Sequence, residues 1–216
     1  KECAKCVEAC KYDAVDLDMA AKSMKLNVGA IVVATGWAPS DAPVIENLGF
    51  GKYPNVITNV MMERLAAPNG PTRGKIQRPS DGKPVETAVF VQCAGSRDEN
   101  YLPYCSGICC LASLKQANYL REQNPESKIH VFYIDLRASG AYEDFLTRMQ
   151  EDEQVVVQKG KVAKIEEDPQ THDLEVQVED ILGGTKKRMK TDLVVLATGM
   201  VPSMAFDPLP IELARD

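Results

Sequence analysis

The pattern of apolar and polar positions becomes regular after residue 85 and predicts a mixed α/β domain. "TAVFVQC" and "KIHVFYID" are short, mostly apolar runs that predict strands. An amphipathic stretch follows each of them, "SGICCLASLKQANYLREQ" and "GAYEDFLTRMQEDE", and each stretch predicts a helix. We expect Ser106 to cap the first helix. Its apolar side is expected to carry Ile108, Leu111, Leu114 and Ala117.

The chain after residue 154 predicts a β-meander. "VVVQKGKVAKIEED", "LEVQVED" and "KKRMKTDLVVLATG" are strand-like, with turns expected at Asp168–Asp173 and Gly183–Gly184. From residue 86 onward the predicted order is therefore β-α-β-α-β-β-β. That order is typical of a small nucleotide-binding-type domain.

The first 85 residues are less regular. "AVDLDM" and "SMKLN" alternate in polarity around a short break and predict a hairpin within residues 1–27. Residues 28–36 are an apolar run that predicts a buried strand ending at Gly36. The stretch 37–85 is rich in Pro, Gly and Asn, and within it "NVMMERLAA" has helical spacing. The expected core positions of that helix are Val60, Met61, Leu65 and Ala66.

One pattern occurs twice in the chain. "GAIVVATGWAPS" (29–40) and "DLVVLATGMVPS" (192–203) share an apolar strand, an "ATG" and a following Pro-Ser. Small residues at the end of a strand allow a ligand or another backbone to approach closely. We therefore expect equivalent roles for the two copies, with a tight turn used twice as the simpler alternative.

Composition narrows the function classes. A net charge of −6 and a pI near 5.1 argue against a nucleic-acid partner. The apolar runs fall short of the ~18 residues of a membrane-spanning helix, and no signal peptide is present. Seven cysteines, an odd number, favour reduced or metal-bound thiols in the cytoplasm. His130 and His172 are expected to be structural, and no catalytic residue is assigned.

Four cysteines share the stretch "VQCAGSRDENYLPYCSGICC" at the spacing C-x11-C-x3-C-C, here called the four-cysteine motif. Cys93 and Cys105 fall on a loop, and Cys109 and Cys110 in the first turn of the predicted helix. The free N–H groups at a helix start stabilise negative charge, as carried by an iron–sulfur cluster on four thiolates. Arg97 would screen part of that charge. A redox-active disulfide, a zinc ion and four small buried side chains are the alternatives.

The same loop lacks the glycines of a dinucleotide site. Such a loop reads G-x-G-x-x-G, because its backbone must approach the pyrophosphate. Here it begins "CAGSR", with Cys93 at the first glycine position and Gly95 as the remaining glycine. This argues against an NAD(P)H-dependent disulfide oxidoreductase. That activity and a non-catalytic, metal-stapled docking module are the two alternative functions.

The other three cysteines form the N-terminal trio, C-x2-C-x3-C. Cys3, Cys6 and Cys10 fit the last three ligands of the bacterial ferredoxin run C-x2-C-x2-C-x3-C-P, with Lys11 where proline is usual. We interpret the trio as a second cluster motif cut by a fragment boundary. Loose thiols at a frayed terminus are the alternative.

These segments carry a specific resemblance. "CAGSRDENYLPYCSGICCLASLKQA" followed by "YIDLRASGAYEDF" resembles the A subunit of heterodisulfide reductase. "VGAIVVATGWAPSDA", "NVITNVMMERLAAPNGPTRGKI" and "AVFVQCAGSRDENYLPYCS" look closer still to the A subunit of the quinone-interacting membrane-bound oxidoreductase complex. The resemblance covers essentially the whole chain.

The resemblance implies a fold and two cofactors. The fold would be α/β, a three-layer FAD/NAD(P)-binding-type (thioredoxin-reductase-like) domain with a β-meander, as a fragment of a two-domain flavoprotein. A [4Fe-4S] cluster would sit on the four-cysteine motif. FAD would belong to the full-length protein, with four residues of the repeated segments on the cofactor side: Thr35, Gly36, Thr198 and Gly199.

The resemblance also implies a division of the chain and a set of partners. Residues 1–27 would hold the truncated ferredoxin-like motif and hairpin, 28–85 part of a split FAD domain, 86–200 a nicotinamide-domain-like domain with the four-cysteine motif, and 201–216 the return to the FAD domain. The protein would pass electrons between the quinone pool and adenylylsulfate reductase, and would meet the membrane only through other subunits of the complex. The isolated fragment is expected to lack FAD and turnover, because the G-x-G-x-x-G fingerprint for FAD is absent.

Overall fold

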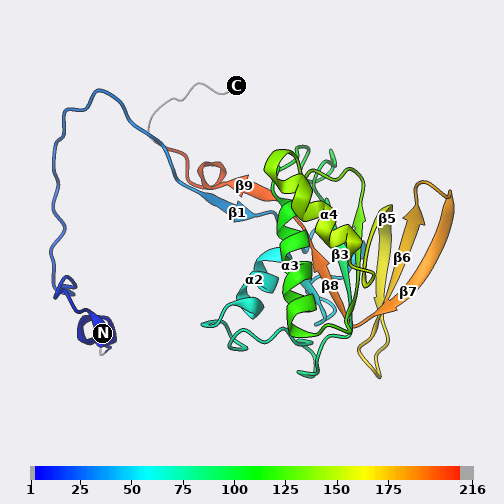
Figure 1. The fold of residues 1–216 in the computed structure, drawn as a ribbon. Helices are drawn as coiled ribbons and strands as arrows, with labels where there is room; N and C mark the ends of the chain where they lie inside the picture. Colours follow the sequence, from blue (N-terminus) through cyan, green and yellow to red (C-terminus); the bar gives the residue numbers. More distant parts are fainter. Residues whose placement is uncertain (1–2, 210–216) are drawn as a thin grey trace. The chain divides into compact units, whose positions relative to one another are not determined.

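The fold is built around one seven-stranded sheet. The structure is a computed structural model and describes residues 3–209. The chain divides into two units that meet between Ala34 and Thr35, and the second unit contains the sheet, in the order β2-β8-β3-β4-β5-β6-β7 (Figure 1). Its strands are β2 (Val56–Thr58), β3 (Thr87–Val91), β4 (Lys128–Tyr133), β5 (Val155–Glu167), β6 (Leu174–Asp180), β7 (Thr185–Thr191) and β8 (Leu193–Leu196).

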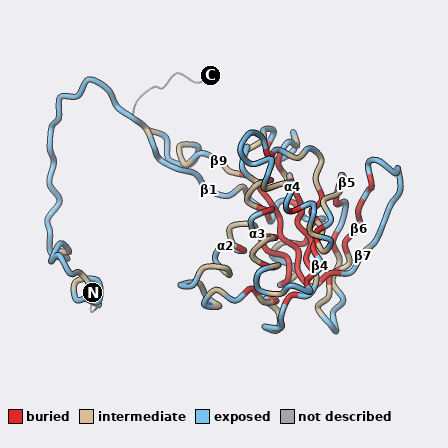
Figure 2. The backbone as a smooth tube through the Cα atoms, viewed as in Figure 1, coloured by how far each residue is buried: buried red, intermediate tan, exposed pale blue. Residues whose placement is uncertain are grey.

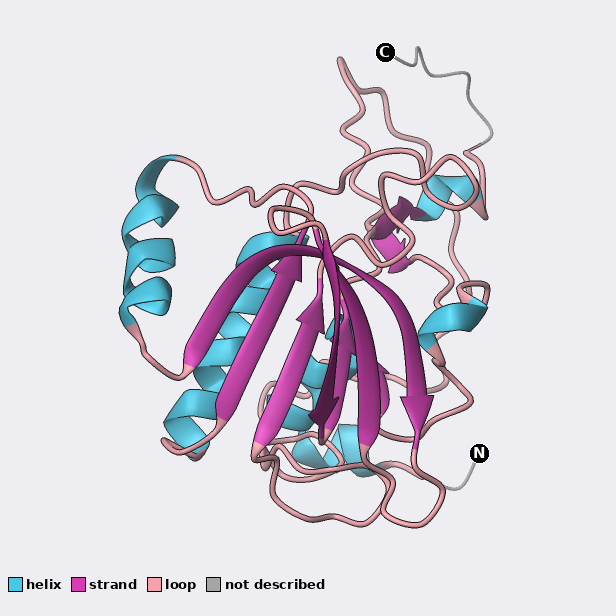
Figure 3. Ribbon diagram, turned by 90° about the vertical axis from the view of Figure 1, so that its right-hand side faces the viewer, coloured by secondary structure: helices cyan, strands magenta, loops and turns pink. Residues whose placement is uncertain are grey.

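Two kinds of pairing share this sheet. β2, β8, β3, β4 and the first part of β5 are parallel neighbours, whereas β5, β6 and β7 pair antiparallel. A register shift between Val162 and Lys164 interrupts the β5–β6 ladder, and such bulges bend a strand. Figure 3 shows the resulting curvature of the sheet. The predicted α/β fold with a β-meander is confirmed.

Helices cover one face of the parallel strands. α2 (Asn59–Ala66), α3 (Cys109–Gln123) and α4 (Glu143–Glu151) lie on this face (Figure 1). Leu114 of α3 and Met149 of α4 pack with Phe90 of β3 in one buried cluster. Figure 2 shows this buried interior beneath the helices. Full burial of one such side chain contributes about 1.5–3 kcal/mol.

The meander covers the opposite face of the parallel strands. Ile165 of β5 and Val176 of β6 pack in a second buried cluster with Val89 and Leu196 from the parallel strands. Strand residues alternate between the two clusters, because successive side chains point to opposite faces. Helices, parallel strands and meander therefore form three layers, as the sequence predicts. Short 3-10 helices also occur within residues 3–209: η1 (Glu46–Leu48), η2 (Gly140–Tyr142) and η3 (Ser203–Ala205).

The start of α3 differs from the prediction. The helix begins at Cys109 rather than after a Ser106 cap, because Gly107 has φ 72° in the left-handed region and interrupts the helical path. The Ser106 Oγ instead accepts a hydrogen bond from the Met200 N–H at 2.8 Å. Ile108, expected on the apolar side, is 50% exposed, whereas Leu114 is fully buried.

Two further predictions about single elements were wrong in part. In α2 the predicted Leu65 and Ala66 do pack against the core, but the buried residue is Met62, and Met61 is 42% exposed. Thr58 sets the start of this helix, since its Oγ1 accepts a hydrogen bond from the Met61 N–H. The three residues before the helix form the buried strand β2, which the sequence pattern did not predict. The expected strand "KKRMKTDLVVLATG" is two strands, β7 and β8, separated at Asp192.

The first unit contains one short helix, α1 (Lys5–Ala9). Among described residues 10–34 there is no strand, so the hairpin predicted within residues 1–27 and the buried strand predicted at 28–36 are wrong. Apolar side chains of the second segment are exposed, Val32 to 90%. A strand requires a neighbour for its backbone groups, and no described segment pairs with this one.

The two repeated segments lie side by side. β1 (Trp37–Pro39) pairs antiparallel with β9 (Met200–Pro202), with Trp37 opposite Pro202. The carbonyl groups of both "ATG" glycines take part: Gly36 accepts from the Ser203 N–H and Gly199 from the Ser40 N–H, each at 3.1 Å. This pair, here called the β1–β9 ribbon, joins the two copies of the pattern (Figure 1).

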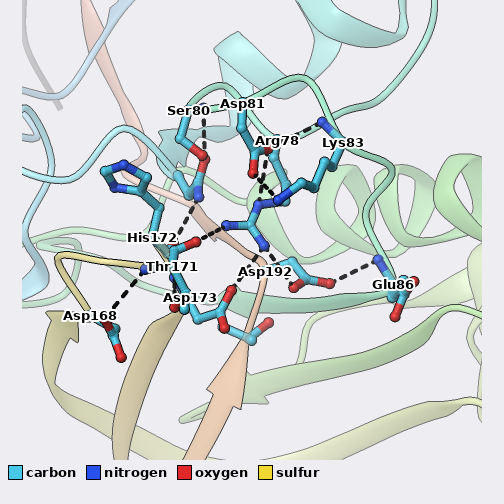
Figure 4. Close-up of polar contacts among 12 residues, drawn as sticks. Arg78, Ser80, Asp81, Lys83, Glu86, Asp168, Thr171, His172, Asp173 and Asp192 are labelled. Carbon is cyan, nitrogen blue, oxygen red and sulfur yellow. Dashed lines mark hydrogen bonds and ion pairs between the residues drawn. The ribbon is translucent and has the colours of Figure 1, made fainter.

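A buried arginine forms ion pairs with residues of several loops at the amino-terminal edge of the parallel strands (Figure 4). The Arg78 side chain is 7% exposed and contacts Asp173 at 2.9 Å and Asp192 at 3.3 Å. It also contacts Asp81 at 3.3 Å and donates to the Thr171 carbonyl at 2.6 Å. Residues from three separate loops thus converge on one cation.

Candidate functional site

The loop after β3 has an unusual backbone. Cys93, Gly95 and Arg97 all have positive φ values, of 53°, 73° and 58°. Only glycine adopts this region at no cost, so two residues with side chains are held there against a steric penalty. The loop is held in place: the Ala94 N–H donates to the Ala197 carbonyl, and Gly95 accepts from Leu102. Strained positions that persist in a structure cluster at functional sites.

The start of α3 supplies the other thiols of the motif. Cys109 and Cys110 occupy its first turn, as predicted, and Ile108 is the N-cap with no side-chain hydrogen bond. Cys105 lies shortly before the helix and accepts a hydrogen bond from the Gly107 N–H at 3.3 Å. The positive end of the helix dipole therefore faces a group of sulfur atoms.

The four thiols of the motif influence one another's ionisation. Burial raises the pKa of Cys93, Cys109 and Cys110, and negative charge on neighbouring thiols raises it further. The pKa of Cys109 reaches about 11, with contributions from the other three cysteines. Four thiolates at this spacing repel, and bound cations would offset the repulsion, since a coordinating thiol is deprotonated outright. The structure thus brings together the four cysteines that the sequence selected.

Nearby N–H groups act on the thiols of the motif. Such donors stabilise a thiolate, and around a metal site they tune its properties. The Gly107 N–H donates to the Cys105 Sγ at 3.3 Å, and the backbone N–H groups of Gly199 and Arg137 lower the pKa of Cys109 and of Cys110 against the larger effect of burial. The positive charge of the Arg97 guanidinium lowers the pKa of Cys93 against the larger effect of burial.

The second "ATG" segment forms one wall of the site. The Ser96 Oγ donates to the Thr198 carbonyl at 3.0 Å, and the Tyr104 hydroxyl donates to the Met200 carbonyl at 3.1 Å. Gly199 has φ 84°, and a Cβ there would lie 2.3 Å from the Ser96 Oγ. Only glycine fits at this position. The segment predicted to face a cofactor therefore contacts the four-cysteine motif.

Two buried hydroxyls beside the motif have no hydrogen-bond partner in the described structure. They are the Oγ1 of Thr198, next to Gly199 in the chain, and the Oγ of Ser113, one helical turn after Cys109 and Cys110. Unpaired buried hydroxyls are costly, and a sulfur-rich group would offer them acceptors. Within residues 3–209, no three His, Cys, Asp or Glu side chains are arranged to hold a single metal ion. Four soft thiolates are the donor set of an iron–sulfur cluster, so the residues fit that group.

The sequence pattern did not predict the contribution of the β4–η2 loop. The Cys110 Sγ donates to the Asp135 carbonyl at 3.8 Å. The Asp135 carboxylate binds the side chains of Arg97 at 3.4 Å and Arg137 at 3.2 Å. Loops that follow adjacent parallel strands meet at the same edge of the sheet, and "IDLRAS" directly follows β4. That topological rule is the signal that identifies these residues.

The remaining predicted residues lie elsewhere. Thr35 and Gly36 are exposed and precede β1. Cys3 and Cys6 are exposed, and the Cys10 Sγ accepts from the Ala14 N–H at 3.4 Å, which lowers the Cys10 pKa. His130 belongs to β4, where burial lowers its pKa. The His172 carbonyl accepts from the Asn55 side chain in a turn.

The fold and the site define an α/β domain with a four-thiol centre at the carboxyl edge of its parallel strands. Curated relatives of the chain are A subunits of heterodisulfide reductases. It is 43% identical over 197 residues to the second iron-sulfur A subunit of the CoB–CoM heterodisulfide reductase of Methanopyrus kandleri, covering 90% of this chain and 30% of the relative. It is 42% identical over 202 residues to the corresponding protein of Methanocaldococcus jannaschii, covering 93% and 31%. The chain thus spans about a third of the length of these relatives.

Among solved structures, the chain is similar to thioredoxin reductases from T. acidophilum (12% identity, TM-score 0.45, covering 79% of this chain and 44% of that one) and Giardia duodenalis (13%, 0.41, 71% and 38%). No protein-family model matches the chain. Within residues 3–209, every helix is too short or too polar to cross a membrane.

We expect this chain to bind NAD(H) with a dissociation constant of about 1 mM or weaker, which corresponds to a binding free energy of about −4 kcal/mol. A dinucleotide needs close backbone approach at the strand-to-helix turn, and here Cys93 and the four-thiol centre occupy that turn. Isothermal titration calorimetry with NADH and NADPH measures the affinity. Micromolar binding would contradict the prediction and favour a nicotinamide-dependent oxidoreductase.

Proposed function

We propose that this chain is part of an electron-transfer flavoprotein of the heterodisulfide reductase A type, and that it holds a [4Fe-4S] cluster on the four-cysteine motif. One observation carries the proposal: four thiols lie on the loop after β3 and at the start of α3, and the Gly107 N–H donates to one of them, the Cys105 Sγ, at 3.3 Å. The names of the Methanopyrus and Methanocaldococcus relatives, iron-sulfur subunits, agree with it.

The residues of the site have distinct tasks under this proposal. A bound cluster supplies a one-electron carrier. The thiols hold it, while the N–H groups of Gly107, Arg137 and Gly199 stabilise negative charge on the sulfurs. Burial of Cys110, which is 7% exposed, limits water at the inner side of the site. The chain's own contribution is thus to position a redox group and tune its potential.

We also assign roles to the rest of the chain. Thr35, Gly36, Thr198 and Gly199 would line the side that faces FAD in the full-length protein, because the β1–β9 ribbon brings both "ATG" segments together. Cys3, Cys6 and Cys10 would be three of the four ligands of a second cluster, with α1 between the first and the last of them. The four domain roles expected from the sequence remain part of this proposal, although the chain divides at Ala34 and β2 and α2 pack with the strands of the 86–200 domain.

The electron partners belong to the same proposal. Relatives are named for CoB–CoM heterodisulfide reduction, and that of Methanosarcina acetivorans is named as ferredoxin/F420H2-dependent. The alternative partners, the quinone pool and adenylylsulfate reductase, are supported by the resemblance of the quoted segments alone. With those partners the protein would be cytoplasmic and would reach the membrane through other subunits. Reoxidation of the reduced full-length protein by a heterodisulfide complex or by adenylylsulfate reductase separates the two.

The cluster itself is tested on anaerobically purified or reconstituted protein. We expect about four iron and about four sulfide per occupied motif, a broad visible absorption and an EPR signal on one-electron reduction. Redox-silent zinc would instead favour a metal-stapled docking module. A metal-free protein with a reversible dithiol–disulfide couple would favour a disulfide oxidoreductase.

A further inference from the structure

The two sequence neighbours of Cys105 bind the same residue, Met200. The Tyr104 hydroxyl donates to the Met200 carbonyl at 3.1 Å, and the Ser106 Oγ accepts from the Met200 N–H at 2.8 Å. Side chains on both sides of this cysteine therefore satisfy both backbone polar groups of Met200. The Cys105 Sγ itself accepts from the Gly107 N–H at 3.3 Å. One thiol of the four-cysteine motif is thus held between two anchored residues.

The place of Met200 in the β1–β9 ribbon explains why its polar groups are available. Met200 lies opposite Pro39, and the next ladder bond runs from the Ser40 N–H to the Gly199 carbonyl at 3.1 Å. Hydrogen-bonded and non-hydrogen-bonded positions alternate along an antiparallel pair, and this pattern gives Met200 a non-hydrogen-bonded position. Its N–H and carbonyl therefore point away from β1. The loop of Cys105 occupies that otherwise unpaired edge of the ribbon.

The same loop packs closely on the residues that lead into β9. The Ser96 Oγ donates to the Thr198 carbonyl at 3.0 Å. A Cβ at Gly199 would lie only 3.0 Å from the Ser106 Oγ, so the loop and the Gly199 backbone are in direct contact. Energetic coupling between two places in a protein is carried by packed and hydrogen-bonded groups of this kind. Such groups connect the loop of Cys105 to the ribbon without a break.

We propose that Tyr104 and Ser106 are positioning residues that join Cys105 to the β1–β9 ribbon, so that binding at the four-cysteine motif and order in the ribbon stabilise each other. A group that fixes Cys105 also fixes its two neighbours, and these hold Met200. Coupling between two sites is reciprocal, so an ordered ribbon in turn strengthens binding at the motif. The ribbon contains parts of both "ATG" segments, and the coupling therefore reaches the side assigned above to FAD. This inference rests on the proposed function.

The test compares hydrogen–deuterium exchange in the metal-free and the reconstituted 216-residue chain, measured by mass spectrometry on peptides that cover β1 and β9. Cluster binding is expected to slow exchange in these peptides about tenfold, the effect of one to two ordinary hydrogen bonds. The double variant Tyr104→Phe/Ser106→Ala removes both side-chain bonds to Met200. Its slowing is expected to be less than about twofold.

The ratio between the two forms separates coupling from a loss of stability alone. A purely structural effect of the double variant would speed exchange equally with and without the cluster, and the ratio would stay near that of the unmodified chain. That result would overturn the inference. It would also be overturned if cluster binding left exchange in the ribbon of the unmodified chain unchanged.

Tyr101→Phe is the matched control. Tyr101 lies in the same loop and is 42% exposed, against 43% for Tyr104, and its hydroxyl makes no hydrogen bond within residues 3–209. This variant is expected to keep the full slowing, whereas Tyr104→Phe alone is expected to fall between the unmodified chain and the double variant. Equal losses in Tyr101→Phe and Tyr104→Phe would refute the role of the bond to Met200.

Iron and sulfide content is measured before exchange. If the unmodified chain takes up no cluster, the proposed function fails, and that outcome is distinct from a bound cluster that leaves the ribbon unaffected. If the double variant retains no iron, Tyr104→Phe and Ser106→Ala are compared singly. Reduced slowing in these single variants supports the inference, and undiminished slowing in both refutes it.

Discussion

Replacing Cys109 or Cys110 by serine is expected to remove most of the iron from the four-cysteine motif. Both thiols lie in the first turn of α3, and the pKa values of both depend on the other cysteines of the motif. A serine oxygen is a harder and poorer ligand for a site built from soft thiolates. Iron and sulfide analysis of each reconstituted variant measures the loss.

The fold of both variants should persist, which makes the loss of iron interpretable. Serine costs a helix only a few tenths of a kcal/mol relative to the residues it replaces, and circular dichroism checks the helix content. Cys3→Ser is the matched control, since the N-terminal trio lacks a fourth ligand in this sequence. Full iron and an unchanged spectrum in both Cys109→Ser and Cys110→Ser would refute the cluster assignment, and an exchangeable disulfide would then explain the motif better.

Arg78→Met is expected to lower the free energy of unfolding by about 3 kcal/mol, at the lower end of the effect of breaking a buried ion pair. The arginine is buried and contacts three carboxylates, those of Asp81, Asp173 and Asp192 (Figure 4). Without it, these three carboxylates lose their common cation and repel one another. Partial exposure of the aspartates lets water screen them, which is why the low end applies. Urea unfolding followed by circular dichroism gives the change.

The control for this prediction is an arginine that also forms an ion pair but lies at the surface. Arg188 contacts Glu175 at 3.2 Å, and its side chain is 68% exposed. Arg188→Met is therefore expected to change stability by less than about 1 kcal/mol. A similar loss in both variants would mean that the converging loops, and not the buried cation, account for the stability of this edge.

Local sequence patterns predicted the centre of the fold well. The strands β3 and β4 and the helices α3 and α4 follow from apolar periodicity, and the positions of Cys109 and Cys110 follow from the start of α3. Errors occurred where a nearby or distant contact changed the local pattern. Ser106 has the chemistry of a helix cap, but the left-handed Gly107 separates it from the helix and its Oγ binds Met200 instead.

Other features depend on contacts that the sequence alone does not show. The residues at 28–36 have the composition of a buried strand, and no described segment pairs with them, so composition was insufficient. Asp135 and Gly199 reach the four-cysteine motif from the ends of β4 and β8, which are far from it in sequence. Only the parallel arrangement of β8, β3 and β4 brings these loops together.

The β1–β9 ribbon also has a consequence for how this domain is built into a longer chain. Because Trp37 and Pro202 are direct partners, the segment between them begins and ends at neighbouring points. A segment of this kind can be spliced into a surface loop of a host protein with little loop-closure entropy and without separating the host's flanking residues. Because of the ribbon, residues 37–202 form a segment with adjacent ends, which suits genetic insertion between two adjacent strands of another protein.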